Sequence, residues 1–309
     1  MKIVYMGTPD FAVGALQALI DAGHEIVLVV TQPDKPKGRG KEMQMTPVKK
    51  CAVANNIPVF QPVKIKDEEA IAELRKYDAD VFVVAAFGQI LSKEILDMPR
   101  LGCFNIHASL LPKYRGAAPI QWVIIDGEKE TGVTIMRMDV GLDTGDMVSK
   151  IIVPIDDTET GESLHDKLMD AGAKLIVETI PQIEAGTAVF EKQDDSLSCY
   201  AKMLNKSLGE IDWNQSAIQI ERLIRGLNSW PSAYTKMNGK TVKIWEAKVV
   251  SGNKNDQTGV ITQVNKDSFL VSCKEDSLMI TSIQLEGKKR VSVKDYLLGH
   301  TLETGILLQ

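Results

Sequence analysis

The sequence lacks most features that mark membrane, secreted or metal-binding proteins. None of its apolar runs reaches the roughly 18 residues needed to span a membrane, and no signal-peptide pattern is visible near the first residue. The four cysteines are widely separated, without the paired spacing of a zinc site or a redox dithiol. We therefore expect a cytoplasmic protein with free thiols, no membrane association and no metal.

A dinucleotide-binding fingerprint is also missing. Gly7-Thr8-Pro9-Asp10 follows the first apolar segment, where a nicotinamide-binding fold would carry Gly-x-Gly-x-x-Gly. This absence argues against a nicotinamide cofactor. The simplest interpretation of Gly7 is a tight turn between a strand and a helix.

Positive charge is scarce overall but unevenly spread. The net charge is −5, which argues against a general polyanion binder, yet residues 206–309 carry 14 Lys+Arg against 11 Asp+Glu and so a net charge of +3. A basic loop is also predicted at residues 33–46, centred on Lys37, Arg39 and Lys41. Both segments permit a local contact with nucleic acid, although on charge alone a solvated surface is favoured.

The 309 residues are enough for two domains, and their composition is that of an ordinary globular protein. Apolar segments at residues 2–6, 26–30, 58–60, 81–86 and 103–107 predict strands, followed by a strand pair at 131–138 and 147–154. Helical patterns fall at 11–22, 48–55, 67–76, 90–96, 119–126 and 163–185. This alternation predicts an α/β fold: a doubly wound, Rossmann-like, mostly parallel sheet with its ligand crevice beyond the carboxyl ends of the strands.

The pattern changes after residue 186. A polar stretch at 191–198 is a linker candidate, a helix is predicted at 214–227, and five short strands follow between 233 and 285. Such closely spaced strands predict a small antiparallel β-barrel, OB-like in type. We therefore divide the chain into a first domain at 1–188, a linker at 189–206 and a second domain at 207–309. Trp213, Trp230 and Trp245 can stack on bases, but tryptophans in a small barrel are more often core residues.

The most informative segment is the predicted strand Cys103–His107, which leads into a loop broken by Pro112. Side chains two residues apart share a face, so Asn105 and His107 point the same way. A carboxamide can donate to an oxyanion, and an imidazole can donate or move a proton near neutral pH. Either residue singly is equally consistent with an ordinary hydrogen-bonded core residue; together they indicate chemistry on a carbonyl group.

Two aspartates further along the chain are candidate partners for His107. Asp143 and Asp146 both lie in a glycine-containing segment, and the residue types do not separate them. Either one is also an ordinary turn residue, because Asp beside Gly is common in loops. The remaining histidines have no metal-like companion.

Several motifs together resemble the methionyl-tRNA formyltransferase family over nearly the whole chain. They are Gly7-Thr8-Pro9-Asp10-Phe11-Ala12, Gly38-Arg39-Gly40-Lys41, Asn105-Ile106-His107-Ala108-Ser109-Leu110-Leu111-Pro112, Thr131-Gly132-Val133-Thr134-Ile135-Met136 and Ile211-Asp212-Trp213. The resemblance implies transfer of a formyl group from 10-formyltetrahydrofolate to the α-amino group of methionyl initiator tRNA. We expect the protein to be a monomer. Residues 1–188 would then be the catalytic domain, with an inserted basic loop at 33–46, and 207–309 a tRNA-binding domain.

The resemblance also implies roles for individual residues. It makes Asn105, His107 and Asp143 the catalytic trio, choosing Asp143 over Asp146. The tetrahydrofolate derivative would be held by Phe87, Gly88, Gln89, Ile90, Leu91, Ser109, Leu110, Leu111, Pro112, Val140 and Gly141. The tRNA would be contacted by Lys37, Arg39 and Lys41.

Other functions share part of this pattern. A glycinamide ribonucleotide transformylase, a sugar-nucleotide formyltransferase or a formyltetrahydrofolate hydrolase could carry the same trio, and only the basic loop and basic C-terminal half favour tRNA. A non-catalytic RNA-binding protein is the alternative from a different class.

Overall fold

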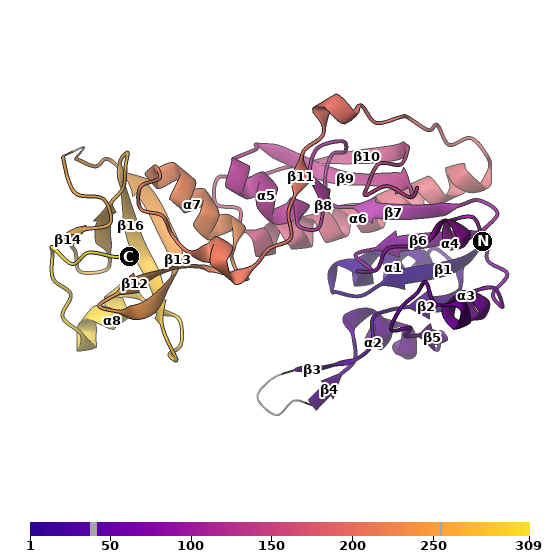
Figure 1. Cartoon of the computed structure of the whole chain (residues 1–309), viewed down its shortest axis with the longest axis horizontal. Helices are drawn as coiled ribbons and strands as arrows, with labels where there is room; N and C mark the ends of the chain where they lie inside the picture. Colours follow the sequence, from indigo (N-terminus) through magenta and orange to yellow (C-terminus); the bar gives the residue numbers. More distant parts are fainter. Residues whose placement is uncertain (38–41, 254) are drawn as a thin grey trace. The chain divides into compact units, whose positions relative to one another are not determined.

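The computed structural model describes residues 1–37, 42–253 and 255–309. Within these ranges the chain divides into two units (Figure 1). The first comprises Met1–Pro119, Glu130–Pro154 and His165–Ala201, and the second comprises Ile120–Lys129, Ile155–Leu164 and Lys202–Gln309. Each unit has its own sheet and its own apolar core.

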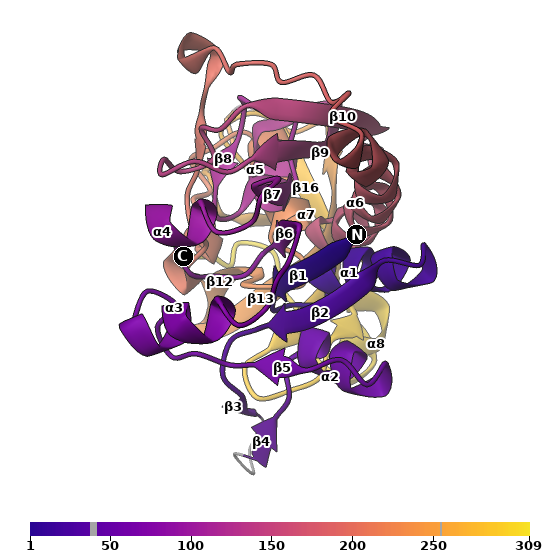
Figure 2. The ribbon, with the colours of Figure 1, turned by 90° about the vertical axis from the view of Figure 1, so that its right-hand side faces the viewer.

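The first unit is built on a sheet whose described strands follow the order β10-β9-β7-β6-β1-β2-β5 (Figure 2). These strands are β1 (Lys2–Gly7), β2 (Glu25–Val30), β5 (Val59–Phe60), β6 (Val81–Ala85), β7 (Cys103–His107), β9 (Glu130–Arg137) and β10 (Met147–Pro154). Each neighbouring pair in the run β5, β2, β1, β6 and β7 is parallel. Strands β9 and β10 add an antiparallel edge next to β7. The predicted mostly parallel sheet is confirmed.

Helices cover both faces of this sheet. The central strands β1 and β6 are nearly continuous apolar runs, as is typical of parallel strands buried on both sides. On one face, Leu74 of α3 (Glu68–Leu74) and Ile95 of α4 (Lys93–Leu96) share a core with Phe82. Helices α1 (Phe11–Asp21) and α6 (Gly161–Glu184) lie on the other face (Figure 2), where Gly172 of α6 packs against Ile106.

The second unit contains an antiparallel sheet in the order β12-β13-β16-β15-β14, with β17 paired to β16. Its strands are β12 (Ala233–Met237), β13 (Lys240–Val250), β14 (Ile261–Val264), β15 (Phe269–Ser272), β16 (Ser277–Leu285) and β17 (Val291–Ser292). The amphipathic helix α7 (Ala217–Gly226) buries Ile220 and Ile224 in one core with Trp213 and Ile280. The predicted C-terminal antiparallel sheet is confirmed, and its closure into an OB-like barrel stays a prediction.

Several short elements were not predicted. A hairpin of β3 (Lys35–Lys37) and β4 (Glu42–Gln44) flanks the centre of the basic loop, and β8 (Arg115–Gly116) pairs in parallel with β11 (Tyr200–Ala201). Helix α8 (Val293–Gly299) and the short 3-10 helices Asp195–Leu197 and Lys206–Gly209 were not predicted either. The predicted helices at 48–55 and 119–126 are present as α2 (Pro47–Ala54) and α5 (Pro119–Asp126). In the described ranges, no helix has the length and apolar character that crossing a membrane requires.

Candidate active site

Strand β7 brings Asn105 and His107 to the carboxyl end of the parallel part of the sheet. Cys103 belongs to the core under α3 and α4, whereas Ile106 faces α6. Because side chains alternate along a strand, Asn105 and His107 lie on the same face as Cys103. Burial raises the pKa of the Cys103 thiol, so this neighbour stays protonated and is no nucleophile.

The His107 ring is buried and held by the loop that follows β7. Its Nε2 atom lies 2.9 Å from the carbonyl oxygen of Tyr114. A carbonyl oxygen only accepts hydrogen bonds, so Nε2 carries a hydrogen and donates it. The other ring nitrogen, Nδ1, is therefore the one available for proton transfer.

Asp143 lies beside that second nitrogen. Its Oδ2 atom is 3.8 Å from His107 Nδ1 and accepts a 2.8 Å hydrogen bond from the backbone N–H of Gly116. The Asp143–His107 separation is too long for a hydrogen bond but short enough for an ion pair once the ring is protonated. Asp143 also has a φ of +53°, a left-handed conformation that its surroundings must stabilise. The structure therefore places Asp143 next to the histidine.

Unlike His107 and Asp143, Asn105 has a side chain without a hydrogen-bond partner among the described residues. The residue is half-buried, and none of the hydrogen bonds in the described part of the chain involves its carboxamide. Polar groups at least partly removed from water are usually paired. An unpaired carboxamide at a strand end is therefore available to a bound molecule.

The loop after β7 is fixed by hydrogen bonds to β9. Thr134 Oγ1 donates to the Ser109 carbonyl oxygen at 2.7 Å and accepts from the Leu111 N–H at 3.1 Å, while Ser109 Oγ donates to the Lys113 carbonyl oxygen at 2.7 Å. These contacts hold the segment that carries Tyr114, and with it His107 Nε2.

The residues predicted to hold folate divide by exposure. Four of them are buried and lie beneath the protein surface: Phe87, Leu91, Ser109 and Leu111. Leu110 packs over Gly132, and Pro112 is half-buried.

The remaining predicted folate residues reach the surface or bind neighbouring backbone. Ile90 and Val140 are 68% and 71% exposed, and Gly88 and Gly141 are exposed beside them in sequence. Gln89 is used internally, because it accepts from the Ile65 N–H at 2.7 Å and donates to the Pro62 carbonyl oxygen at 3.1 Å. Of the residues predicted to hold folate, Ile90 and Val140 are therefore the ones whose apolar side chains are exposed to a flat ring system.

The residues predicted to contact tRNA lie in and beside the β3–β4 hairpin. Lys37 ends β3, and Arg39 and Lys41 lie outside the described residues. Just before β3, Asp34 forms a 2.5 Å ion pair with Lys49 and accepts a 2.7 Å hydrogen bond from Gln61. These two contacts lower the pKa of Asp34 and anchor the start of the hairpin.

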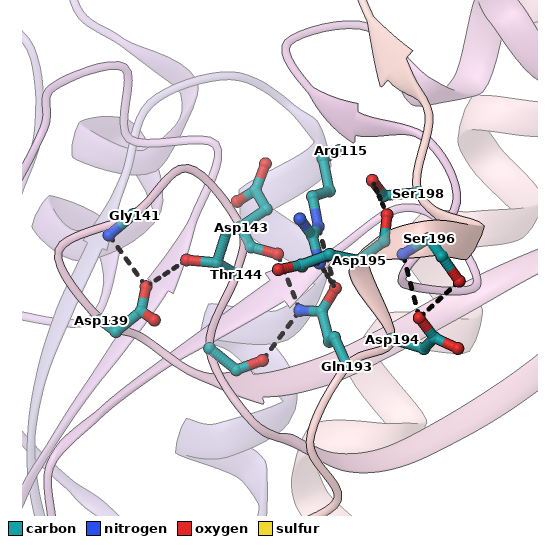
Figure 3. A network of polar contacts seen from close by, with 11 residues as sticks. Arg115, Asp139, Gly141, Asp143, Thr144, Gln193, Asp194, Asp195, Ser196 and Ser198 are labelled. Carbon is teal, nitrogen blue, oxygen red and sulfur yellow. Dashed lines mark hydrogen bonds and ion pairs between the residues drawn. The ribbon is translucent and has the colours of Figure 1, made fainter.

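A network not predicted from the sequence surrounds Asp143 (Figure 3). Gln193 donates from Nε2 to the carbonyl oxygens of Asp143 at 2.7 Å and Gly145 at 2.8 Å. Its Oε1 atom accepts from Nε and Nη2 of Arg115, which also forms an ion pair with Asp195. Gln193 lies in the polar stretch expected to be a linker, and nothing in its local sequence indicates this contact.

A large cavity lies elsewhere, in the second unit. It measures about 840 Å³ and is lined mainly by α7, β13 and the residues around Asp156. Three of the basic side chains that line it form ion pairs with carboxylates: Arg225 with Glu221, Lys129 with Asp157, and Arg290 with Glu246. We place the chemistry at the end of β7, because Asn105, His107 and Asp143 come together there and none of them lines this cavity.

Comparison with known proteins identifies the family. A formyl transferase model matches residues 1–180, and a model of the formyl transferase C-terminal domain matches residues 203–301. The methionyl-tRNA formyltransferase of Agathobacter rectalis is 57% identical over 305 residues, covering 99% of this chain and 98% of that relative. The chain belongs to the methionyl-tRNA formyltransferase family. The methionyl-tRNA formyltransferase of Clostridioides difficile is 54% identical over the full length of both chains.

Solved structures share the fold of this methionyl-tRNA formyltransferase family member. A sugar 3N-formyl transferase determined in the presence of dTDP and 5-N-formyl-THF has a TM-score of 0.68 and 23% identity, covering 94% of this chain and 99% of that one. HypX from Aquifex aeolicus in complex with tetrahydrofolic acid has a TM-score of 0.62 and 14% identity, covering 99% of this chain and 50% of that one.

Proposed function

We propose that this protein transfers the formyl group of 10-formyltetrahydrofolate to the α-amino group of methionyl initiator tRNA. The formyl donor is a substrate that supplies an activated formyl carbon. Family membership supports the reaction, and the geometry at the end of β7 carries the assignment of residues. There a free carboxamide stands beside a histidine with one ring nitrogen fixed and the other facing a carboxylate.

Asn105 has the role of an oxyanion donor in this proposal. Attack of the uncharged amine on the formyl carbon creates a tetrahedral centre with a negatively charged oxygen. The Asn105 amide group can donate to that oxygen without breaking any other hydrogen bond. A preorganised donor of this kind typically accounts for roughly 10²–10³-fold in rate.

In this proposal, His107 and Asp143 act together on the proton that the attacking amine loses. Because His107 Nε2–H is held by the Tyr114 carbonyl oxygen, only Nδ1 can gain or lose a proton during the reaction. When Nδ1 is protonated, it becomes a second donor to the oxyanion, and the Asp143 carboxylate 3.8 Å away stabilises its charge. Asp143 thus orients the ring and assists removal of the proton that the amine loses. The tetrahedral centre then collapses: the bond between the formyl carbon and the tetrahydrofolate nitrogen breaks, and tetrahydrofolate leaves with a proton on that nitrogen.

The binding surfaces follow from exposure and charge. The exposed side chains of Ile90 and Val140 offer apolar area to the flat ring of the folate, and Lys37, Arg39 and Lys41 offer positive charge to the tRNA backbone. We further propose catalysis by residues 1–188 and tRNA binding by the C-terminal residues 207–309, connected through 189–206. The protein would act as a monomer in the cytoplasm.

One assay tests the reaction. The protein is incubated with 10-formyltetrahydrofolate and methionyl initiator tRNA, and the tRNA is deacylated and analysed for N-formylmethionine. A parallel incubation contains an amino-sugar nucleotide as acceptor. Formyl transfer to methionine supports the proposal, whereas transfer to the sugar alone, or release of free formate alone, would refute it.

A further inference from the structure

Every hydrogen-bonding position of the Gln193 side chain is used. A carboxamide has two N–H donors and two acceptor positions on its oxygen. Gln193 donates to the carbonyl oxygens of Asp143 and Gly145, and it accepts from Nε and Nη2 of Arg115 at 3.0 and 2.8 Å. A fully satisfied and half-buried amide fixes the position of its partners.

These contacts close a circuit around Asp143. Gln193 holds the backbone carbonyl of Asp143, and the N–H of Gly116 holds its carboxylate at 2.8 Å. Gly116 follows Arg115 in β8. Arg115 in turn donates to Gln193 (Figure 3). Displacing Gln193 therefore shifts both the backbone of Asp143 and the donor that holds its carboxylate.

The conformation of Asp143 makes this support necessary. With a φ of +53°, its backbone occupies the left-handed region, which is unfavourable for residues with a side chain. Residues adopt it where surrounding contacts impose it. The hydrogen bond from Gln193 Nε2 is one such contact. It holds the backbone carbonyl of Asp143, while the carboxylate of the same residue lies 3.8 Å from His107 Nδ1.

We propose that Gln193 is a positioning residue for Asp143. Gln193 makes no contact with His107 among the described residues, and it acts by fixing where the Asp143 carboxylate stands. The inference rests on the proposed role of Asp143 in formyl transfer. It also assigns a part in the reaction to the polar stretch at 191–198, which the sequence pattern marks as a linker.

Two substitutions remove the donation from Gln193 in different ways. Gln193→Met keeps the length of the side chain and removes all four hydrogen bonds. Gln193→Glu keeps the acceptor for Arg115 but sets a carboxylate oxygen against two carbonyl oxygens. Ser196→Ala is the matched control, since the hydrogen bonds of Ser196 among the described residues go to Asp194 in the same turn.

We expect both Gln193 variants to lower kcat about ten- to hundredfold, because small displacements of catalytic groups have effects of that size. The KM for each substrate should change by no more than about twofold, since Gln193 bonds to none of the proposed binding residues. Ser196→Ala should retain wild-type kcat. Circular dichroism and thermal unfolding verify folding, and if Gln193→Met does not fold, Gln193→Glu carries the same test.

The decisive measurement is the double variant Gln193→Met/Asp143→Asn. If Gln193 acts through Asp143, the double variant is no more than about twofold slower than Asp143→Asn alone. Multiplying effects, or wild-type kcat in both Gln193 variants, would overturn the inference while leaving the role of Asp143 intact. Wild-type kcat in Asp143→Asn would instead overturn the proposed role of Asp143, and this inference with it.

Discussion

His107 Nδ1 and Asp143 Oδ2 are 3.8 Å apart, which is longer than a hydrogen bond but within the distance of an ion pair. Meanwhile the Asp143 carboxylate bonds to Gly116, and His107 Nε2 bonds to Tyr114. The pair is therefore held from outside by one loop, residues 114–116. Catalytic hydrogen bonds are often long without substrate and shorten when it binds.

Asp143→Asn should lower kcat about 10²–10⁴-fold, the usual range for loss of acid–base assistance. The asparagine oxygen can still accept from Gly116, so the loop should keep its position, but the negative charge opposite His107 is gone. Steady-state formylation kinetics and a binding titration with the formyl donor measure the two effects. Near-normal turnover, or loss of donor binding in place of turnover, would contradict the assignment.

Asn105→Ala should lower kcat roughly 10²–10³-fold through loss of an oxyanion donor. Because the Asn105 side chain makes none of the hydrogen bonds in the described structure, the thermal unfolding midpoint should not fall. Asn55→Ala is the control with the opposite expected result. It removes hydrogen bonds to the Cys51 carbonyl and to Gln17 and should cost about 1 kcal/mol of stability, while kcat should not change. A destabilised but fully active Asn105→Ala would identify Asn105 as structural.

Arg39→Ala should weaken use of methionyl-tRNA and reduce the slope of log affinity against log salt by about one, as expected for a lost phosphate contact. Lys93→Ala, which removes an exposed cation paired with Asp97, should leave the slope unchanged. Activity toward a small methionine derivative distinguishes the interpretations. Equal loss on both acceptors would show that the loop serves folate binding or folding.

Asp34→Asn should destabilise the protein at neutral pH and not at strongly acidic pH. Contacts with Lys49 and Gln61 lower the pKa of Asp34 in the folded state, so its ionised form is favoured by folding. That stability is present above the unfolded-state pKa, about 3.9, and is lost as pH falls through the lower folded-state pKa. Urea unfolding at several pH values measures the difference, which should close at the acidic end of the series.

Trp213→Ala should lower the free energy of unfolding by about 3–5 kcal/mol, as is usual for a buried tryptophan. Trp213 is 5% exposed and donates from Nε1 to Thr235 at 3.0 Å, whereas Trp230 is 55% exposed. Trp230→Ala should change stability by no more than about 0.5 kcal/mol. Urea unfolding of both variants compares them, and similar losses would mean that Trp230 is also a core residue.

The sequence predicted the parts of this fold that depend on local pattern. Strands such as Val81–Ala85 are recognisable because a strand buried on both faces must be apolar throughout. The joint placement of Asn105 and His107 followed from the two-residue period of a strand. Asp143 could be chosen over Asp146 only through family resemblance, because the residue types are the same.

The support around the site was not predictable from local sequence. Gln193 bonds to Asp143 across 50 residues of chain, and Tyr200 pairs with Arg115 through two-residue strands. Such short strands carry no periodicity. A polar stretch between two domains has the same composition whether it is solvated or, like residue 193, bonded to backbone carbonyls.

The contacts of residues 191–201 determine where a fragment that contains the first unit can end. Glu191 pairs with Met147 at the edge of β10, Gln193 and Asp195 reach Arg115, and Ala201 pairs with Gly116. A recombinant fragment that ends at residue 188 would lose all of these contacts, leaving the edge of β10 and the Asp143 loop uncovered. A fragment intended to keep these contacts should therefore extend through Ala201, where the last segment of the first unit ends.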